Sequence, residues 1–300
     1  MRIGFIGTGT MGRPMAANLL KKGHTVVGYD VVPEALAAAA ALGVEPAGSA
    51  AEAAKGADVV VTMLPSSPHV EVVYLGARGV LEGVGQGRLC IDMSTIDPSV
   101  SRRVAEAARA RGVRFVDAPV SGGVTRAEEG TLTIMVGGDA RDVDEARPAL
   151  ACMGANVIHV GPVGSGEVAK ICNNLIAGVA AVAVSEAFRI AEGFGVDPTT
   201  LTQVIAKSSG ATFIMEHAHP VPGQVAKAPA NRDYAPGFMT DLMAKDLGLA
   251  VSAARDLRVP VFVAPAAQQV LRLASSHGLG RKDFSVVYQF LKPSGTDAPV

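Results

Sequence analysis

The 300-residue sequence contains no tryptophan and only three cysteines, Cys90, Cys152 and Cys172, at wide spacing. An odd number of cysteines at this spacing forms neither a zinc-binding pattern nor a disulfide framework. We therefore expect a reducing compartment, the cytoplasm, in which the cysteines act as small buried hydrophobic residues.

An excess of charge of one sign is also absent, because 27 basic residues balance 28 acidic ones for a net charge of −1. This balance argues against binding to nucleic acid or to a membrane surface through bulk charge. The most apolar stretch, 175–184, is Ala-rich and is closed by Ser185, Glu186 and Arg189. It is too short to span a bilayer, so we expect a buried helix and no membrane partner. The N-terminus lacks the long apolar run of a signal peptide.

Short Val/Ile-rich segments alternate with Ala-rich helical segments in the first half of the chain. Strands are predicted at 2–6, 25–29, 58–64, 89–93, 113–117, 131–136 and 156–160, and helices at 11–22, 33–42 and 98–111. This alternation is typical of an α/β fold with a Rossmann-type, doubly wound parallel sheet and right-handed crossovers.

The pattern changes after Gly164-Ser165-Gly166, beyond which strand signals are almost absent. A long helix is predicted at 167–194, with an Ala/Val-rich middle that we expect to be buried all round. Further helices are predicted at 198–208, 238–256, 264–277 and 283–291. We therefore predict a Rossmann domain at 1–163, an all-helical domain for substrate binding and oligomerisation at 164–293, a long helix joining them, and a flexible tail at 294–300.

A glycine-rich turn, Gly7-Thr8-Gly9-Thr10-Met11-Gly12, links the first predicted strand to the first predicted helix. In this context the spacing indicates a dinucleotide site. Gly7 permits the tight turn, Gly9 lets the backbone approach the pyrophosphate, and Gly12 lets helix and strand pack closely. Because the helix N-terminus offers N–H groups and a positive dipole end to phosphates, we predict cofactor contacts at Gly7, Gly9, Thr10, Met11 and Gly12.

Asp30 ends the second predicted strand, where a carboxylate can accept hydrogen bonds from the adenosine ribose and repel a 2′-phosphate. Val31 and Val32 follow, where an NADP enzyme is expected to carry Arg or Lys. The sequence therefore predicts NAD as the cofactor. Ligands of parallel sheets bind at the carboxyl ends of the strands, so we predict further cofactor contacts at Leu64, Pro65, His69 and Thr95.

Three later segments carry candidate chemistry. Asp117-Ala118-Pro119-Val120-Ser121-Gly122-Gly123 leaves a strand and places two glycines after a serine, which favours a backbone cradle for a carboxylate, with Asp117 a structural group at the strand end. Lys170 and Asn174 are four residues apart and share one helical face. Lys245-Asp246-Leu247 lies inside a predicted helix, where we expect Asp246 to be a salt-bridge partner or a cap.

With these motifs the chain resembles the 3-hydroxyisobutyrate dehydrogenase family, the short β-hydroxyacid dehydrogenases related to 6-phosphogluconate dehydrogenase. The matching segments follow the family's order over most of the chain: Gly7-x-Gly9-x-x-Gly12, Asp117 to Gly123, Gly130-Thr131-Leu132, Gly164-x-Gly166-x-x-x-Lys170-x-x-Asn173-Asn174 and Lys245-Asp246-Leu247.

The resemblance implies an enzyme that oxidises an alcohol β to a carboxylate with NAD, first of all 3-hydroxyisobutyrate to methylmalonate semialdehyde in valine degradation. It implies that Lys170 is the general acid and base at the hydroxyl. A free lysine has a pKa of about 10.4, so we expect burial near an oxidised nicotinamide to lower it. The residues implied in substrate binding are Ser121, Gly122, Gly123, Asn174 and Lys245, with Lys245 also near the cofactor.

No metal is expected, because the cofactor supplies the hydride chemistry and the protein supplies position and a proton acceptor. His217 and His219 without further ligands favour a loop over a metal site. The resemblance also implies a homodimer or homotetramer.

Several alternatives stay open. Sibling enzymes acting on serine, on tartronate semialdehyde or glycerate, or on succinic semialdehyde share these motifs. Imine reductases have a related fold in which the lysine is typically replaced, and some non-enzymatic dinucleotide-binding modules have lost it. Lys170 argues against these last two classes.

Overall fold

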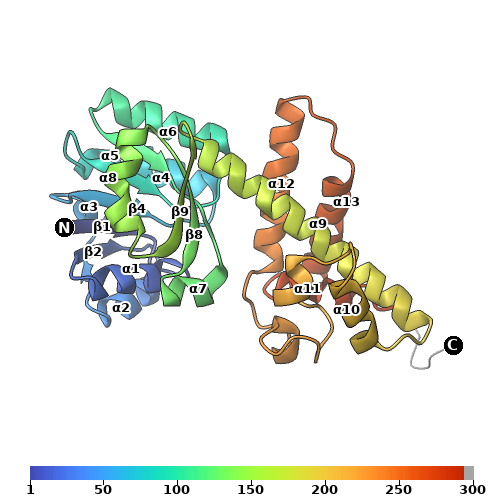
Figure 1. Ribbon diagram of the computed structural model, residues 1–300. Helices are drawn as coiled ribbons and strands as arrows, with labels where there is room; N and C mark the ends of the chain where they lie inside the picture. The colour runs from blue at the N-terminus through green and yellow to red at the C-terminus, as the bar shows by residue number, and fades with distance from the viewer. Residues whose placement is uncertain (294–300) are drawn as a thin grey trace. The chain divides into compact units, whose positions relative to one another are not determined.

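In the computed structural model, which describes residues 1–293, the chain divides into two compact units, Met1–Lys170 and Ile171–Val300 (Figure 1). The tail predicted at 294–300 lies outside the described residues. Each unit has its own hydrophobic core.

The first unit contains one nine-stranded sheet in the order β3-β2-β1-β4-β5-β6-β8-β7, with β9 paired to β8. Its strands are β1 (Arg2–Ile6), β2 (Thr25–Tyr29), β3 (Glu45–Pro46), β4 (Val59–Thr62), β5 (Leu89–Asp92), β6 (Arg114–Asp117), β7 (Val120–Ser121), β8 (Leu132–Gly137) and β9 (Gly154–Gly161). All neighbours from β3 to β6 are parallel, as predicted. In contrast, β8 runs antiparallel to β6 and β7.

Helices cover both faces of this sheet, as expected for buried parallel strands. They are α1 (Gly12–Lys21), α2 (Pro33–Ala40), α3 (Ala50–Ala54), α4 (Ser67–Leu75), α5 (Val80–Gly83), α6 (Pro98–Ala110), α7 (Gly123–Glu129) and α8 (Ala140–Leu150). Adjacent strand residues alternate between two cores: Val61 packs with residues of α1, α7 and α8, and Val60 with residues of α3 to α6. The continuous apolar strands in the sequence are explained by this two-sided burial.

The second unit is helical, and its described residues contain no strand beyond an isolated bridge between Met239 and Asp283. Its helices are the greater part of α9 (Ser165–Gly193), then α10 (Pro198–Ala206), α11 (Phe213–His217), α12 (Thr240–Asp256), α13 (Val263–Ala274) and α14 (Val287–Phe290). Short helical turns at Pro229–Arg232, Ser275–Leu279 and Phe284–Val286 connect them. The helix predicted at 283–291 is therefore a 3₁₀ turn followed by one α-helical turn.

The long helix α9 is present as predicted, but the expectation that it is buried all round is wrong. Ile176 and Ile190 are 69% and 63% exposed, so one face of the helix is apolar yet uncovered in the isolated chain. By length and composition α9 could cross a membrane, with 44% of its most apolar window buried. Core helices of soluble proteins pass the same test, so this is weak support for a membrane span.

Candidate active site

The turn between β1 and α1 requires glycine at two of its three motif positions. Gly7 has a φ of +91°, and a Cβ there would lie 2.2 Å from the carbonyl oxygen of Met63. A Cβ on Gly12 would lie 1.8 Å from the carbonyl oxygen of Gly7. A Cβ on Gly9, by contrast, would face open space. This open side, together with a first turn of α1 that holds no acidic residue, fits the pyrophosphate of a dinucleotide.

Asp30 follows β2 and holds the backbone of the glycine turn. Its Oδ2 accepts a hydrogen bond from the N–H of Thr8 at 2.7 Å, and its Oδ1 accepts one from the N–H of Val32 at 2.9 Å. A carboxylate has about four acceptor positions, so room is left for ribose hydroxyls. Val31 and Val32 are 76% and 48% exposed and offer no cation to a 2′-phosphate.

A buried hydrogen-bond network joins the carboxyl ends of β4 and β5. Asp92 Oδ1 accepts from Thr62 Oγ1 and from Ser94 Oγ, each at 2.6 Å, and Tyr74 lies 3.1 Å from the Thr62 hydroxyl. Ser94 Oγ in turn accepts the N–H of Leu64 at 2.8 Å. The network therefore fixes the backbone at one predicted cofactor contact. Sequence reasoning missed it, although Asp92 gave a signal, since an aspartate in an apolar strand is rarely buried unless it is paired.

The remaining predicted cofactor contacts lie in the segments after the same two strands. His69 is exposed in the first turn of α4, with Nδ1 2.7 Å from Ser66 Oγ. Thr95 is half-buried directly after Ser94. Because β2, β1, β4 and β5 are parallel neighbours, the glycine turn, Asp30 and these segments all follow carboxyl ends at one edge of the sheet.

The Ser121-Gly122-Gly123 segment joins β7 to α7 through two glycines in conformations that favour glycine. Gly122 has a φ of +142° and Gly123 a φ of +68°. A Cβ on Gly122 would also lie 2.7 Å from the Arg126 side chain. Ser121 is half-buried and pairs with Thr133 of β8. The backbone thus turns sharply after the serine, as the predicted carboxylate cradle requires.

Lys170 lies in the second turn of α9 and is only 6% exposed, so its predicted burial is confirmed. Asp117, the last residue of β6, holds the start of this helix by accepting the N–H of Gly164 at 2.6 Å and that of Glu167 at 3.0 Å. Burial raises the pKa of Asp117 to about 6, although these N–H groups act in the opposite direction. Its predicted structural role is confirmed.

In the second unit, Asp246 joins two of the predicted substrate-binding residues. Its Oδ2 accepts a hydrogen bond from Asn174 Nδ2 at 2.5 Å, and its Oδ1 lies 3.1 Å from Lys245 Nζ. The Asn174 Oδ1 accepts from Asn173 at 3.0 Å. The contact with Lys245 confirms the salt-bridge role predicted for Asp246, which is only 1% exposed. The two hydrogen bonds of Asn174 fix the orientation of its side-chain amide.

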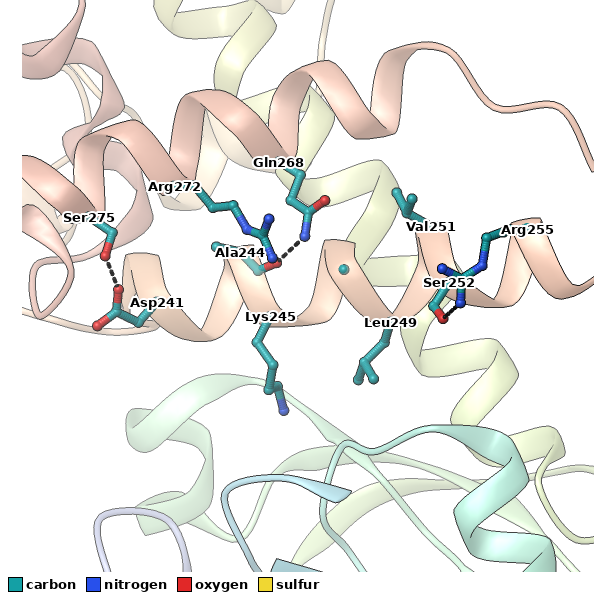
Figure 2. Close-up of a pocket in the computed structure, with 11 residues that line it drawn as sticks. Asp241, Ala244, Lys245, Leu249, Val251, Ser252, Arg255, Gln268, Arg272 and Ser275 are labelled. Carbon is teal, nitrogen blue, oxygen red and sulfur yellow. Dashed lines mark hydrogen bonds between the residues drawn. The ribbon is translucent and has the colours of Figure 1, made fainter. Parts of the chain in front are cut away.

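A pocket of about 590 Å³ lies along α12 and α13 (Figure 2). Its charged lining is mostly basic, with Lys245, Arg255 and Arg272 against Asp241. Figure 2 shows Gln268 and Arg272 extending from α13 toward α12, whereas Lys245 leaves α12 on the other side. The amine of Lys245 therefore points away from the side chains of Gln268 and Arg272.

The two neighbouring histidines have structural contacts. His219 is buried, accepts the N–H of Val221 at 3.2 Å and lies 3.1 Å from Thr202 Oγ1. His217 stacks on Phe213 with ring centres 4.2 Å apart. Among residues 1–293, no group of three His, Cys, Asp or Glu side chains is arranged to hold a metal ion.

Two family models match the chain. Residues 2–161 match the NAD binding domain of 6-phosphogluconate dehydrogenase. Residues 164–291 match the family described as NAD-binding of NADP-dependent 3-hydroxyisobutyrate dehydrogenase. Together the two matches cover nearly the whole chain, with the change from one to the other just before α9 begins.

Individual proteins are similar over the same length. A probable mitochondrial 3-hydroxyisobutyrate dehydrogenase of Dictyostelium discoideum is 46% identical, over 96% of this chain and 90% of that protein. An NAD-dependent L-serine dehydrogenase of Pseudomonas aeruginosa is 44% identical over 98% of each chain. The solved structure of a Mycobacterium tuberculosis 3-hydroxyisobutyrate dehydrogenase with L-serine has a TM-score of 0.92 at 41% identity, covering 97% of this chain and 99% of that one.

Proposed function

Because the chain belongs to the 3-hydroxyisobutyrate dehydrogenase family of NAD-dependent β-hydroxyacid dehydrogenases, we propose that it oxidises 3-hydroxyisobutyrate to methylmalonate semialdehyde, a step of valine degradation. The observation that carries the proposal is the buried Lys170, with Asn174 one helical turn further along α9. Curated relatives named for this activity are 42–46% identical to the chain over nearly its full length.

Lys170 serves as the base and acid at the substrate hydroxyl. When bound, NAD would supply the hydride acceptor through its nicotinamide, while the glycine turn, with its open Gly9, would hold its pyrophosphate. The Lys170 amine takes the hydroxyl proton as the alcohol becomes an aldehyde, and returns it in the reverse direction. The proposed substrate contacts are the Ser121-Gly122-Gly123 cradle at the carboxylate, Asn174 as the group that orients the substrate, and Lys245 as a source of positive charge.

Replacement of the lysine tests the mechanism. Lys170→Ala is expected to lower kcat by about 10²- to 10⁴-fold, the usual contribution of a positioned base, with little change in NADH binding measured by fluorescence. Lys207→Ala, which removes an exposed lysine after α10, is the matched control and keeps full activity. Wild-type turnover by Lys170→Ala would show that the mechanism is wrong.

Serine is the second candidate substrate, because a relative named NAD-dependent L-serine dehydrogenase is as similar as the 3-hydroxyisobutyrate dehydrogenases. Values of kcat/KM with NAD for 3-hydroxyisobutyrate, serine, glycerate and 3-hydroxypropionate decide between them. We expect the highest value for 3-hydroxyisobutyrate. A strong preference for serine or glycerate contradicts the first choice while leaving the reaction class intact.

We also propose that the enzyme prefers NAD to NADP, since Asp30 repels a 2′-phosphate and Val31 and Val32 do not compensate its charge. Asp30→Asn keeps the shape of the side chain and removes its charge. The ratio of kcat/KM for NAD to that for NADP is expected to fall about tenfold in this variant, the effect of about 1.4 kcal/mol. Asp144→Asn, the same change at an exposed residue of α8, should leave the ratio unaltered.

A homodimer or homotetramer is proposed because several large apolar side chains of the second unit are more than half exposed. They are Ile176, Ile190, Phe194, Val204, Phe213, Leu257, Val259, Phe262, Val263 and Leu273. Light scattering during size exclusion should show a dimer or tetramer, and a monomer at all concentrations contradicts the proposal. A cytoplasmic location and the absence of nucleic-acid and membrane partners stay predictions, and the mitochondrial names belong to the relatives.

A further inference from the structure

Asp117 takes no part in the reaction proposed above, yet it is fully buried at the end of β6. A buried carboxylate is costly unless hydrogen bonds replace its lost hydration. Both of its oxygens accept backbone N–H groups from the start of α9, Oδ1 from Gly164 and Oδ2 from Glu167. These belong to the set of N–H groups that a helix leaves without internal partners at its N-terminus, so the carboxylate and the helix end satisfy each other.

Two glycines enclose this carboxylate. A Cβ on Gly137 of β8 would lie 2.5 Å from Asp117 Oδ1. A Cβ on Gly166 would lie 2.8 Å from Asp117 Oδ2 and 2.4 Å from the carbonyl oxygen of Met135. Since neither glycine position has room for even a Cβ beside the carboxylate, β8 and the helix start enclose it closely and leave its oxygens little freedom to turn. The close approach explains why Gly166 belongs to the motif before the lysine.

Glu167 provides a second attachment of the same helical turn. Its side chain is fully buried, and Oε2 accepts the N–H of Ile96 at 3.1 Å. Ile96 directly follows Thr95, a proposed cofactor contact after β5. The first turn of α9 is therefore tied to β6 through Asp117 and to the segment after β5 through Glu167.

Lys170 lies three residues beyond Glu167, which is slightly less than one helical turn. A rotation of α9 by about 10° would move an atom about 6 Å from the helix axis by about 1 Å. A displacement of about 1 Å between reacting groups can lower a rate about 100-fold. A small rotation of the first turn of α9 is thus enough to lower the rate of proton transfer strongly.

We propose that Asp117 and Glu167 are positioning residues for Lys170: they fix the rotation and height of the first turn of α9, and with it the place of the lysine amine. This inference rests on the proposed function, which assigns the proton transfer to Lys170.

Asp117→Asn tests the proposal directly. An asparagine has one acceptor oxygen and one NH₂ group, so either Gly164 or Glu167 must direct its N–H at a donor. We expect kcat to fall about 30- to 100-fold, with NADH affinity and KM within about twofold of wild type. Ser49→Ala is the control, since it removes a buried cap of α3 in the same unit. It should cost about 1 kcal/mol of stability and leave kcat unchanged.

Glu167 gives a second pair of variants if Asp117→Asn does not fold. Glu167→Ala removes the acceptor for Ile96 and is expected to lower kcat about tenfold at unchanged NADH affinity. Glu167→Gln retains an oxygen that can accept this N–H, so it should restore most of the loss. If Glu167→Ala and Glu167→Gln both fold and both have the kcat of the wild type, the proposed role of Glu167 is wrong.

Rescue by ethylamine separates positioning from a general structural role. In Lys170→Ala the added amine is not attached to α9, so its rate should not depend on Asp117. The rescued rates of Lys170→Ala and of Lys170→Ala/Asp117→Asn are therefore expected to agree within about twofold. If ethylamine rescues neither, their residual rates are compared instead, with equality again expected. A further loss in the double variant overturns the inference.

The outcomes also separate this inference from the proposed function. Full turnover by Lys170→Ala contradicts the proposed function itself. An inactive Lys170→Ala beside Asp117→Asn and Glu167→Ala variants with wild-type kcat leaves that function standing and rejects only the positioning role.

Discussion

Asp246 shows how a single buried carboxylate can order two polar neighbours. Asn174 and Lys245 each direct a donor at one of its oxygens. In Asp246→Asn one of these donors must face the NH₂ group, so we expect a loss of about 1–3 kcal/mol of stability and a lower kcat/KM. Asp256→Asn is the control on the same helix, because its contact with Arg255 is exposed and is expected to change stability by less than about 0.5 kcal/mol. Thermal unfolding and steady-state kinetics measure both. Equal effects of the two substitutions contradict the ordering role of Asp246.

Single residues are predictable from sequence where their chemistry needs a local spacing. Gly7 and Gly12 follow from a turn of fixed length, and the burial of Lys170 follows from the apolar helix around it. Asp92 and the two hydrogen bonds of Asp117 to α9 are different, because they depend on partners from other strands and helices. The pattern of residues within one segment does not predict which backbone N–H group of another segment will donate a hydrogen bond to it. The sequence therefore shows these buried carboxylates only as acidic residues in or at the end of apolar strands, without indicating their partners.

At the scale of elements, the apolar strands and the long helices are predictable because burial sets their pattern. Short helices such as α3, α4, α7 and α8 are not. In α8 the helix contains Pro148 and many charged side chains, yet Val143, Ala146 and Leu150 are buried on one face. Tertiary packing thus stabilises a segment whose composition resembles a loop. The exposed face of α9 is the opposite case, since its apolar residues predict burial that the isolated chain does not provide.

Two glycines of α9 make the packing of this helix testable. A Cβ on Gly178 would lie 2.5 Å from a methyl group of Leu247, which is fully buried in α12, whereas a Cβ on Gly193 would meet nothing within 4 Å. Gly178→Ala is therefore expected to destabilise the protein by about 1–2 kcal/mol through overpacking. Gly193→Ala should be neutral or stabilise by up to about 1 kcal/mol, the difference in helix propensity. Urea unfolding measures both. A stabilised Gly178→Ala contradicts the close contact between α9 and α12.

At the scale of the whole molecule, the two units carry buried groups that respond to acid in opposite directions. Burial raises the pKa of Asp117 in the first unit from 3.8 to about 6. Its contribution to stability is therefore complete below pH 3.8 and is lost as the pH rises through about 6. Burial lowers the pKa of His219 in the second unit from 6.5 to about 4, although the N–H of Val221 acts against this. Its contribution is complete above pH 6.5 and is lost as the pH falls through about 4.

His219→Gln isolates the second of these contributions, because glutamine keeps polar contacts to Thr202 and Val221 but does not titrate. The measured quantity is the unfolding free energy of the wild type minus that of the variant. This difference should fall by up to about 3 kcal/mol between pH 7 and pH 4, which corresponds to a pKa lowered by about 2.5. The same difference for Asp117→Asn should move in the opposite direction over this range, since the wild-type aspartate gains a proton in the fold before it does in the unfolded chain. Urea unfolding followed by circular dichroism at a series of pH values measures both. Because each comparison cancels the groups that the two proteins share, differences that change with pH in the same direction would mean that at least one of these side chains does not titrate as its burial requires.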